Sequence, residues 1–115
     1  MYVGGSIQDY GTILNSERND ISPYFLTSTV SAVLSNRISY CFDLNGPSIT
    51  LDTACAASLT ALHLAYAAIE RKECDAAIVA GVNLILDPLS TAHFSRLGVL
   101  YKTGMCRAFD DGADG

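Results

Sequence analysis

Residues 48–64 read SITLDTACAASLTALHL, and this stretch decides the fold of the 115-residue chain. Its first six residues alternate in character and are rich in β-formers, which predicts a strand over Ser48–Thr53. From Ala54 to about Lys72 the apolar side chains point in nearly every direction, which predicts a buried helix. Cys55 therefore stands where a strand passes into the N-terminus of a helix.

Further strands are predicted on both sides of this helix. Residues Asp75–Leu86 are almost continuously apolar, which is typical of a central strand covered on both faces. Asp87-Pro88 ends that strand, and Leu89–Leu97 is predicted to be helical, while Met1–Gly5 resembles the end of another strand. Strand, helix and strand make a βαβ unit whose right-handed crossover places the two strands parallel in one sheet. The predicted fold class is α/β.

Residues 6–24 are polar and predict a loop with a helical turn in its first half. Over Thr27–Phe42, apolar residues recur at helical spacing, which predicts one helix started by a cap at Ser28 or Thr29. Asn45-Gly46-Pro47 is predicted to end this helix. Its predicted apolar face consists of Val30, Val33, Leu34, Ile38 and Cys41.

The composition favours a packed intracellular protein and disfavours several functions. Half of the residues are hydrophobic and 17% are charged, so part of the surface is expected to lie against a partner or the rest of a larger domain. The net charge is −5 and no basic cluster exists, which argues against nucleic-acid binding. No apolar run is long enough to span a membrane and no signal peptide is visible, so we expect a cytoplasmic location.

The pattern of cysteines, histidines and glycines indicates neither a metal site nor a nucleotide-phosphate site. The four cysteines include no C-x-x-C pair, and only two histidines accompany them. Gly4-Gly5 lacks the rest of any phosphate-binding fingerprint, and Asp110-Asp111 is expected to lie in a surface loop.

The position of Cys55 suits a nucleophile. Unpaired N–H groups and the positive dipole end at a helix N-terminus stabilise a thiolate and hold an oxyanion. The small neighbours Ala54, Ala56 and Ala57 leave room for a substrate. From position alone, a cysteine that merely packs between sheet and helix is an equally good interpretation.

The wider sequence favours the nucleophile. Asp52-Thr53-Ala54-Cys55-Ala56-Ala57-Ser58-Leu59 closely resembles the ketosynthase active-site signature, usually written Asp-Thr-Ala-Cys-Ser-Ser-Ser-Leu. The resemblance, to type I and nearest to iterative fungal-type polyketide synthases, continues through nearly the whole chain. It includes residues 34–48, 61–65, 79–88 and 106–110. Two signature serines are alanines here, and Tyr101-Lys102 stands where the family often has Ser-Pro.

This resemblance implies a thiolase-like layered α/β fold with the nucleophile helix buried between two sheets. It implies that residues 1–115 are part of the N-terminal half of a ketosynthase domain, incomplete at both ends. Cys55 would take an acyl group from an acyl carrier protein, and decarboxylative Claisen condensation with a malonyl-type extender would follow. The backbone N–H of Cys55 would belong to the oxyanion hole, and Phe94 would line the acyl pocket.

The family also implies partners and groups outside this sequence. No cofactor or metal is bound directly, because the carrier protein bears the phosphopantetheine arm, and the full domain is a homodimer. The catalytic histidines and a lysine belong to blocks that follow those present here. His63 lies roughly 12 Å along the helix from Cys55, too far for a hydrogen bond, and is expected to be packed. His93 matches no catalytic block, and Asp52 is expected to steady the turn.

Three alternatives stay open from the sequence. Another thiolase-fold enzyme, such as a thiolase or chalcone-type synthase, shares the cysteine-on-helix arrangement but not these flanking residues. A non-catalytic ketosynthase-like partner usually lacks the cysteine. The isolated 115-residue chain is expected to be inactive, because it holds one nucleophile and no base within reach.

Overall fold

The chain folds as two units, Met1–Leu84 and Ile85–Gly115, and the computed structural model describes residues 1–6, 9–16 and 22–113. The elements of the first unit are β1 (Tyr2–Gly4), α1 (Asp9–Ser16), α2 (Phe25–Thr29), α3 (Ala32–Cys41), β2 (Ile49–Leu51), a 3-10 turn (Ala54–Ala56), α4 (Ala57–Glu70) and β3 (Val79–Gly81). The second unit contains α5 (Pro88–Arg96). No helix in the described part of the chain is long and apolar enough to cross a bilayer.

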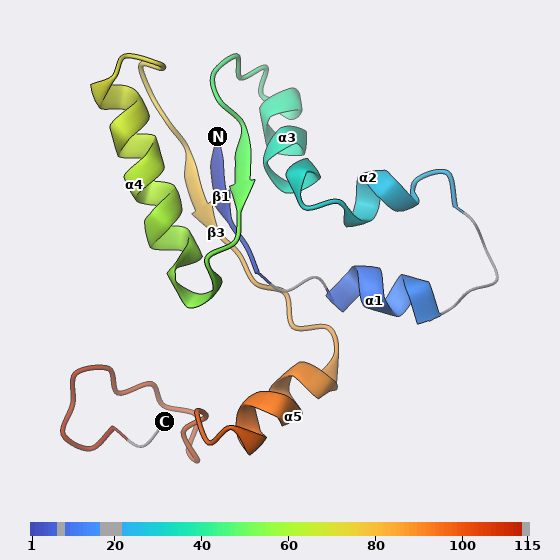
Figure 1. The fold of residues 1–115 in the computed structure, drawn as a ribbon, viewed down its shortest axis with the longest axis vertical. Helices are drawn as coiled ribbons and strands as arrows, with labels where there is room; N and C mark the ends of the chain where they lie inside the picture. Colours follow the sequence, from blue (N-terminus) through green and yellow to red (C-terminus); the bar gives the residue numbers. More distant parts are fainter. Residues whose placement is uncertain (7–8, 17–21, 114–115) are drawn as a thin grey trace. The chain divides into compact units, whose positions relative to one another are not determined.

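A parallel sheet with strand order β2-β1-β3 is the centre of the first unit (Figure 1). The predicted βαβ unit is confirmed, because β2 and β3 run parallel in one sheet on either side of β1. Tyr2 is in register with Ile49 on one side and with Val79 on the other. The predicted strand end at Met1–Gly5 is therefore the middle strand of the three.

The strand predicted over Asp75–Leu86 is much shorter than expected. β3 comprises three residues, and its ladder with β1 ends where the Val82 N–H donates to the Gly4 carbonyl at 2.9 Å. A strand extends only as far as its partner stays extended. Because β1 ends at Gly4, the apolar residues that follow β3 leave the sheet and are exposed.

The two faces of the sheet carry alternate residues of each strand, as the two-residue period of a strand requires. Tyr2 and Val79 contribute to the core beneath α4, together with the helix residues Ala61, Ala65 and Ala68. Thr50, one position away from Ile49, instead bonds to α3. Figure 1 shows α4 and α3 on opposite sides of the sheet. Burial in this core raises the pKa of the Tyr2 hydroxyl.

Only one side of α4 is covered in this structure. Its alanines at 57, 61, 65 and 68 are buried against the sheet. The opposite side is apolar but exposed, with Leu59 at 70% and Tyr66 at 62% of their full accessibility. Burial of α4 was predicted because the helix has no polar face. Among the described residues, the sheet covers its alanine side, and the opposite apolar side is exposed.

The single helix predicted over Thr27–Phe42 is wrong. Val30 adopts an extended conformation (ψ 124°) and separates α2 from α3, and neither Ser28 nor Thr29 caps α3. The helix α3 ends at Cys41, before Asn45-Gly46-Pro47, because Asp43 takes a left-handed conformation (φ 50°). The Leu44 N–H then donates to the Ser39 carbonyl at 2.9 Å, which closes the helix end.

The face of α3 that is buried also differs from the prediction. Ser35 and Ser39 are buried, whereas Leu34 and Cys41 of the predicted apolar face are exposed. Serines allow close approach to the sheet. The Ser35 hydroxyl accepts from the Thr50 hydroxyl of β2 at 3.0 Å, and the Ser39 hydroxyl lies 2.8 Å from that of Ser48, just before β2. In the preceding segment, the predicted helical turn is confirmed as α1, whereas residues 7–8 and 17–21 of the predicted loop lie outside the described residues.

The second unit begins with a well-defined helix start. The Asp87 side chain accepts a hydrogen bond from the Leu89 N–H at 2.9 Å, and Pro88 occupies the first turn of α5. Gly98 follows the helix with φ 72°, a conformation that glycine adopts without strain. The helix predicted over Leu89–Leu97 is confirmed. The described residues beyond Gly98 form successive turns.

Candidate functional site

Cys55 lies in the turn that joins β2 to α4. The strand ends at Leu51, and the 3-10 turn Ala54–Ala56 leads directly into the helix. The thiol-bearing residue is exposed. The predicted strand-to-helix junction is therefore confirmed, with Cys55 two residues ahead of the first residue of α4.

Two side-chain hydrogen-bond systems hold this turn. On the strand side, a carboxylate oxygen of Asp52 accepts from the Ala54 N–H at 2.8 Å, as expected of a residue that steadies the turn. On the helix side, the Thr60 hydroxyl donates to the Ala56 carbonyl at 3.0 Å and lies 3.0 Å from the Thr53 hydroxyl. Cys55 is thus bracketed by fixed residues on both sides.

The backbone N–H groups of the turn differ in whether they donate a hydrogen bond to a protein acceptor. Ala56 donates to the Thr53 carbonyl at 3.2 Å, and Ala57 donates to the Ala54 carbonyl. Ala54 donates to Asp52. Within the residues that the structure describes, the Cys55 N–H has no protein acceptor. The Cys55 backbone amide is therefore available to an oxygen atom of a bound molecule.

The first turn of α4 rests directly on the sheet. A Cβ atom added to Gly4 would lie 2.5 Å from the Ala57 carbonyl oxygen and 2.6 Å from the Ser58 backbone nitrogen. A Cβ added to Gly81 would lie 2.5 Å from the Ser58 Cβ. No such contact is sterically possible, so the two glycines set how closely the helix approaches. The height of Cys55 above the sheet follows from this packing.

Sequence reasoning missed these two glycines as parts of the site. From the sequence, Gly4 belongs to a predicted strand end and to an incomplete phosphate-binding fingerprint, and Gly81 belongs to an apolar strand that resembles the family. The available signal was the glycine itself, because glycine inside a strand often marks a close approach of another backbone. Leu51, Gly4 and Gly81 share one register row across the sheet, so both glycines lie beneath the same helix turn.

Neither histidine belongs to the Cys55 turn. His63 is in α4 and is exposed, so the prediction of a packed histidine is wrong. The physical reason is that α4 buries only its alanine side, and position 63 faces away from it. His93 is exposed in the last turn of α5. Phe94, the candidate for the acyl pocket, also belongs to α5 and is 42% exposed.

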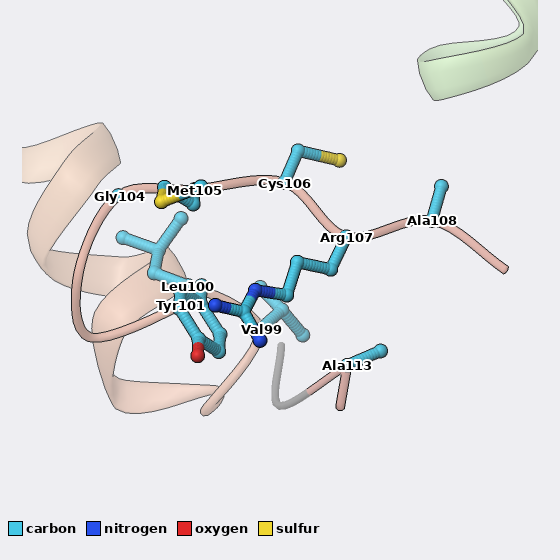
Figure 2. A pocket seen from close by; sticks show the side chains of 9 residues that line it. All are labelled: Val99, Leu100, Tyr101, Gly104, Met105, Cys106, Arg107, Ala108 and Ala113. Carbon is cyan, nitrogen blue, oxygen red and sulfur yellow. The ribbon is translucent and has the colours of Figure 1, made fainter. Parts of the chain in front are cut away.

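A separate pocket of about 470 Å³ lies within the second unit (Figure 2). Arg107 lies over the Tyr101 ring, with its guanidinium carbon 5.4 Å from the ring centroid, a cation–π contact that gives Tyr101 a local structural role. Phe94, although in the same unit, does not line this pocket. Its walls are formed by Val99, Leu100, Tyr101, Gly104, Met105, Cys106, Arg107, Ala108 and Ala113.

Metal ligands do not gather anywhere in the described ranges. Within residues 1–6, 9–16 and 22–113, no group of three or more His, Cys, Asp or Glu side chains is placed to hold an ion. All four cysteines are free thiols, and Cys74 is the one that is partly buried.

Sequence comparison finds one matching family and a set of relatives. The profile of the family described as "Beta-ketoacyl synthase, N-terminal domain" matches residues 1–115. Over its whole length the chain is 46% identical to "Probable polyketide synthase 1" of Dictyostelium discoideum and 47% identical to "Polyketide synthase ThaG" of Burkholderia thailandensis. It is also 46% identical to "Cyclo-acetoacetyl-L-tryptophan synthase" of Aspergillus oryzae. The chain spans 4%, 2% and 3% of these relatives.

Solved structures give the same result for the fold. An oxazolomycin ketosynthase domain from Streptomyces albus superposes with a TM-score of 0.77 at 40% identity, covering 99% of this chain and 20% of that one. The ketosynthase of module 6 of the bacillaene synthase from Bacillus subtilis gives a TM-score of 0.74 at 35% identity, covering 99% and 18%. The fold is therefore a segment of the layered α/β architecture of these ketosynthases.

Proposed function

The chain belongs to the beta-ketoacyl synthase family, as a segment of a type I polyketide synthase ketosynthase domain, and from this premise we propose that Cys55 is its nucleophile. One observation carries the proposal. Among the described residues, an exposed thiol and a backbone N–H without a protein acceptor belong to the same residue, in a turn held on both sides. Nucleophilic acyl transfer requires such a pair. We also propose that residues 1–115 are part of the N-terminal half of the domain.

The first step is acyl transfer. The Cys55 thiolate attacks the carbonyl carbon of an acyl thioester on the carrier protein, and a bond forms between this carbon and Sγ. The carbonyl oxygen becomes an oxyanion that accepts a hydrogen bond from the Cys55 N–H. The carbon–sulfur bond to the carrier then breaks, and the carrier leaves as a thiolate, which takes up the proton that the Cys55 thiol released. The product is an acyl-enzyme on Cys55.

The second step is condensation. A malonyl-type extender on the carrier protein loses carbon dioxide, and the carbanion attacks the acyl carbonyl on Cys55. The bond to Sγ breaks, the thiolate is regenerated, and the lengthened β-ketoacyl group stays on the carrier. We place the general acid–base groups for the decarboxylation outside these residues, because His63 and His93 are exposed and neither belongs to the Cys55 turn.

The partners follow from this chemistry. The substrates are thioesters of an acyl carrier protein, whose phosphopantetheine arm carries the acyl and malonyl groups, and the complete domain would act as a homodimer. Phe94 would line the acyl pocket. The proposal needs no metal, since attack and decarboxylation rely on the thiolate and on hydrogen-bond donors.

The test is acyl loading in the full polypeptide that carries this segment. Cys55→Ala should abolish acylation by an N-acetylcysteamine thioester, measured by peptide mass spectrometry, and should leave the melting temperature nearly unchanged because residue 55 is exposed. Cys41→Ala is the matched control, since Cys41 is an exposed thiol at the end of α3, and this variant should load normally. Persistent loading in Cys55→Ala would remove Cys55 as the nucleophile.

The isolated 115-residue chain gives a second test. It should form no condensation product from acyl and malonyl thioesters, because the acid–base groups are missing. Condensation by the purified chain would show that the reaction needs no group beyond these residues.

A further inference from the structure

Ala54, the residue immediately before Cys55, has a left-handed backbone with φ 51°. Alanine is strained in this conformation because its Cβ approaches the following carbonyl oxygen. Asp43, Lys72 and Phe109 also have positive φ. Asp43 and Lys72 each follow the last turn of a helix and close the helix end, and Phe109 lies in a turn of the second unit. Ala54 instead precedes a helix, so its strain has a different origin.

The structure provides one group that stabilises this conformation. The Asp52 carboxylate accepts the Ala54 N–H at 2.8 Å, a hydrogen bond to a charged acceptor, and such bonds are among the stronger ones in proteins. Asp52 itself is exposed at the end of β2. Strained residues of this kind persist only where the surroundings hold them, and they concentrate at functional sites.

The hydrogen bond also decides which amide remains available. With Ala54 bonded to Asp52, and with Ala56 and Ala57 bonded to backbone carbonyls, the Cys55 N–H is left without a protein acceptor in the described part of the turn. If the Ala54 backbone rotated to a right-handed conformation, the peptide plane between Ala54 and Cys55 would turn with it. The direction of the Cys55 N–H would then change.

We infer that Asp52 is a positioning residue, which holds Ala54 left-handed and thereby aims the Cys55 N–H at the developing oxyanion. The inference rests on the proposed function, because it assumes that Cys55 is acylated. Asp52 acts through the backbone and need not contact the substrate. An acceptor oxygen at position 52 is therefore required, whereas its negative charge is not.

Four variants of the full polypeptide test this inference. Asp52→Ala removes the acceptor, and Asp52→Asn keeps an oxygen without the charge. The double variant Asp52→Ala with Ala54→Gly removes the acceptor but provides a residue that adopts positive φ without strain. Asp75→Ala is the control, because Asp75 is an exposed acid of the same unit that lies beyond α4.

Two rates are compared for each variant. Acylation by an N-acetylcysteamine thioester needs the oxyanion donor, whereas alkylation by iodoacetamide displaces iodide without forming an oxyanion. We expect Asp52→Ala to slow acylation about tenfold, since misplaced donors cost at least this much, and to change alkylation less than about twofold. Asp52→Asn and the glycine double variant should recover most of the acylation rate, and Asp75→Ala should match the unsubstituted protein.

The outcomes separate this inference from the proposed function. If Cys55 is acylated normally in Asp52→Ala, or if neither Asn nor the glycine variant restores the rate, the inference is overturned while Cys55 remains the nucleophile. If acylation in the unsubstituted protein occurs at a residue other than Cys55, the proposed function itself is wrong. Should Asp52→Ala fail to fold, the ratio of acylation to alkylation in Asp52→Asn decides, and a tenfold fall there overturns the inference.

Discussion

The helices α4 and α3 cover opposite faces of the same three-stranded sheet by different chemistry. Helix α4 packs its alanines with Tyr2 and Val79. Its first turn, at Ala57 and Ser58, lies directly against Gly4 and Gly81 of the strands. Helix α3 packs through serines, and the Thr50 hydroxyl donates to Ser35 Oγ at 3.0 Å and accepts from the Ser35 N–H at 3.2 Å. The contact of α4 with the sheet is limited by steric repulsion at the two strand glycines. The contact of α3 with the sheet is held by hydrogen bonds between small side chains.

This difference matters because the candidate nucleophile precedes α4. Backbone atoms cannot rotate away from a clash as a hydroxyl can rotate to a new partner, so the position of α4 tolerates less change than that of α3. The stiffer of the two contacts is the one beneath Cys55. Enlarging the sheet residues under α4 should therefore cost more than removing a hydroxyl under α3.

The largest effect is expected from Gly4→Ala. The new Cβ would lie 2.5 Å from the Ala57 carbonyl oxygen, and both the strand and the helix backbone would have to move. Overpacking of this kind costs about 3 kcal/mol of unfolding free energy. Acylation of Cys55 should fall as well, because the shift displaces the turn. Chemical denaturation and the acylation rate of the full polypeptide measure the two effects.

Gly5→Ala is the matched control for this variant. A Cβ at Gly5 would lie 3.5 Å from its nearest neighbour, the Val82 carbonyl oxygen, which is an ordinary contact. Both stability and acylation should stay close to those of the unsubstituted protein. Equal losses in the Gly4 and Gly5 variants would mean that the strand end, rather than the contact with α4, is sensitive to substitution.

A smaller effect, about 2 kcal/mol, is expected from Gly81→Ala, because its new Cβ meets one side-chain carbon, Ser58 Cβ, at 2.5 Å. Removing that carbon should relieve the clash, so Ser58→Gly combined with Gly81→Ala should be more stable than the sum of the single effects predicts. A double-mutant cycle by chemical denaturation measures the coupling. Strict additivity would show that the two residues do not press on each other.

Local sequence predicted several elements well. The β-rich run before Asp52, the helix after Cys55 and the helix over Leu89–Leu97 each have a signal within a few residues, and the structure confirms all three. The order of strands had no such signal. The neighbours of a strand in a parallel sheet depend on the elements that cover the sheet. Nothing in Tyr2–Gly4 alone therefore indicated that this strand lies between β2 and β3.

Two features of the packing and the site also escaped the sequence. The predicted buried face of α3 was derived from the spacing of its apolar side chains. The structure instead buries Ser35 and Ser39, because small side chains that form hydrogen bonds fit against the sheet. The left-handed conformation of Ala54 was hidden because alanine gives no sign of positive φ. Its signal was two residues earlier, since an aspartate often accepts from the backbone N–H two positions on.

The smallest effect is expected on the α3 side, from Thr50→Val. Valine has nearly the same shape but removes the hydroxyl that accepts from the Ser35 N–H and donates to Ser35 Oγ. Losing this partner should cost about 1 kcal/mol of unfolding free energy, and Thr50→Ser, which keeps the hydroxyl, should recover most of it. Acylation of Cys55 should not change, because Thr50 faces away from α4. A contrary result would be that Thr50→Val destabilises the protein as much as Gly4→Ala does, or that it slows the acylation of Cys55. Either result would show that the two faces of the sheet are not independent, and it would contradict the contrast between a rigid α4 contact and an adaptable α3 contact.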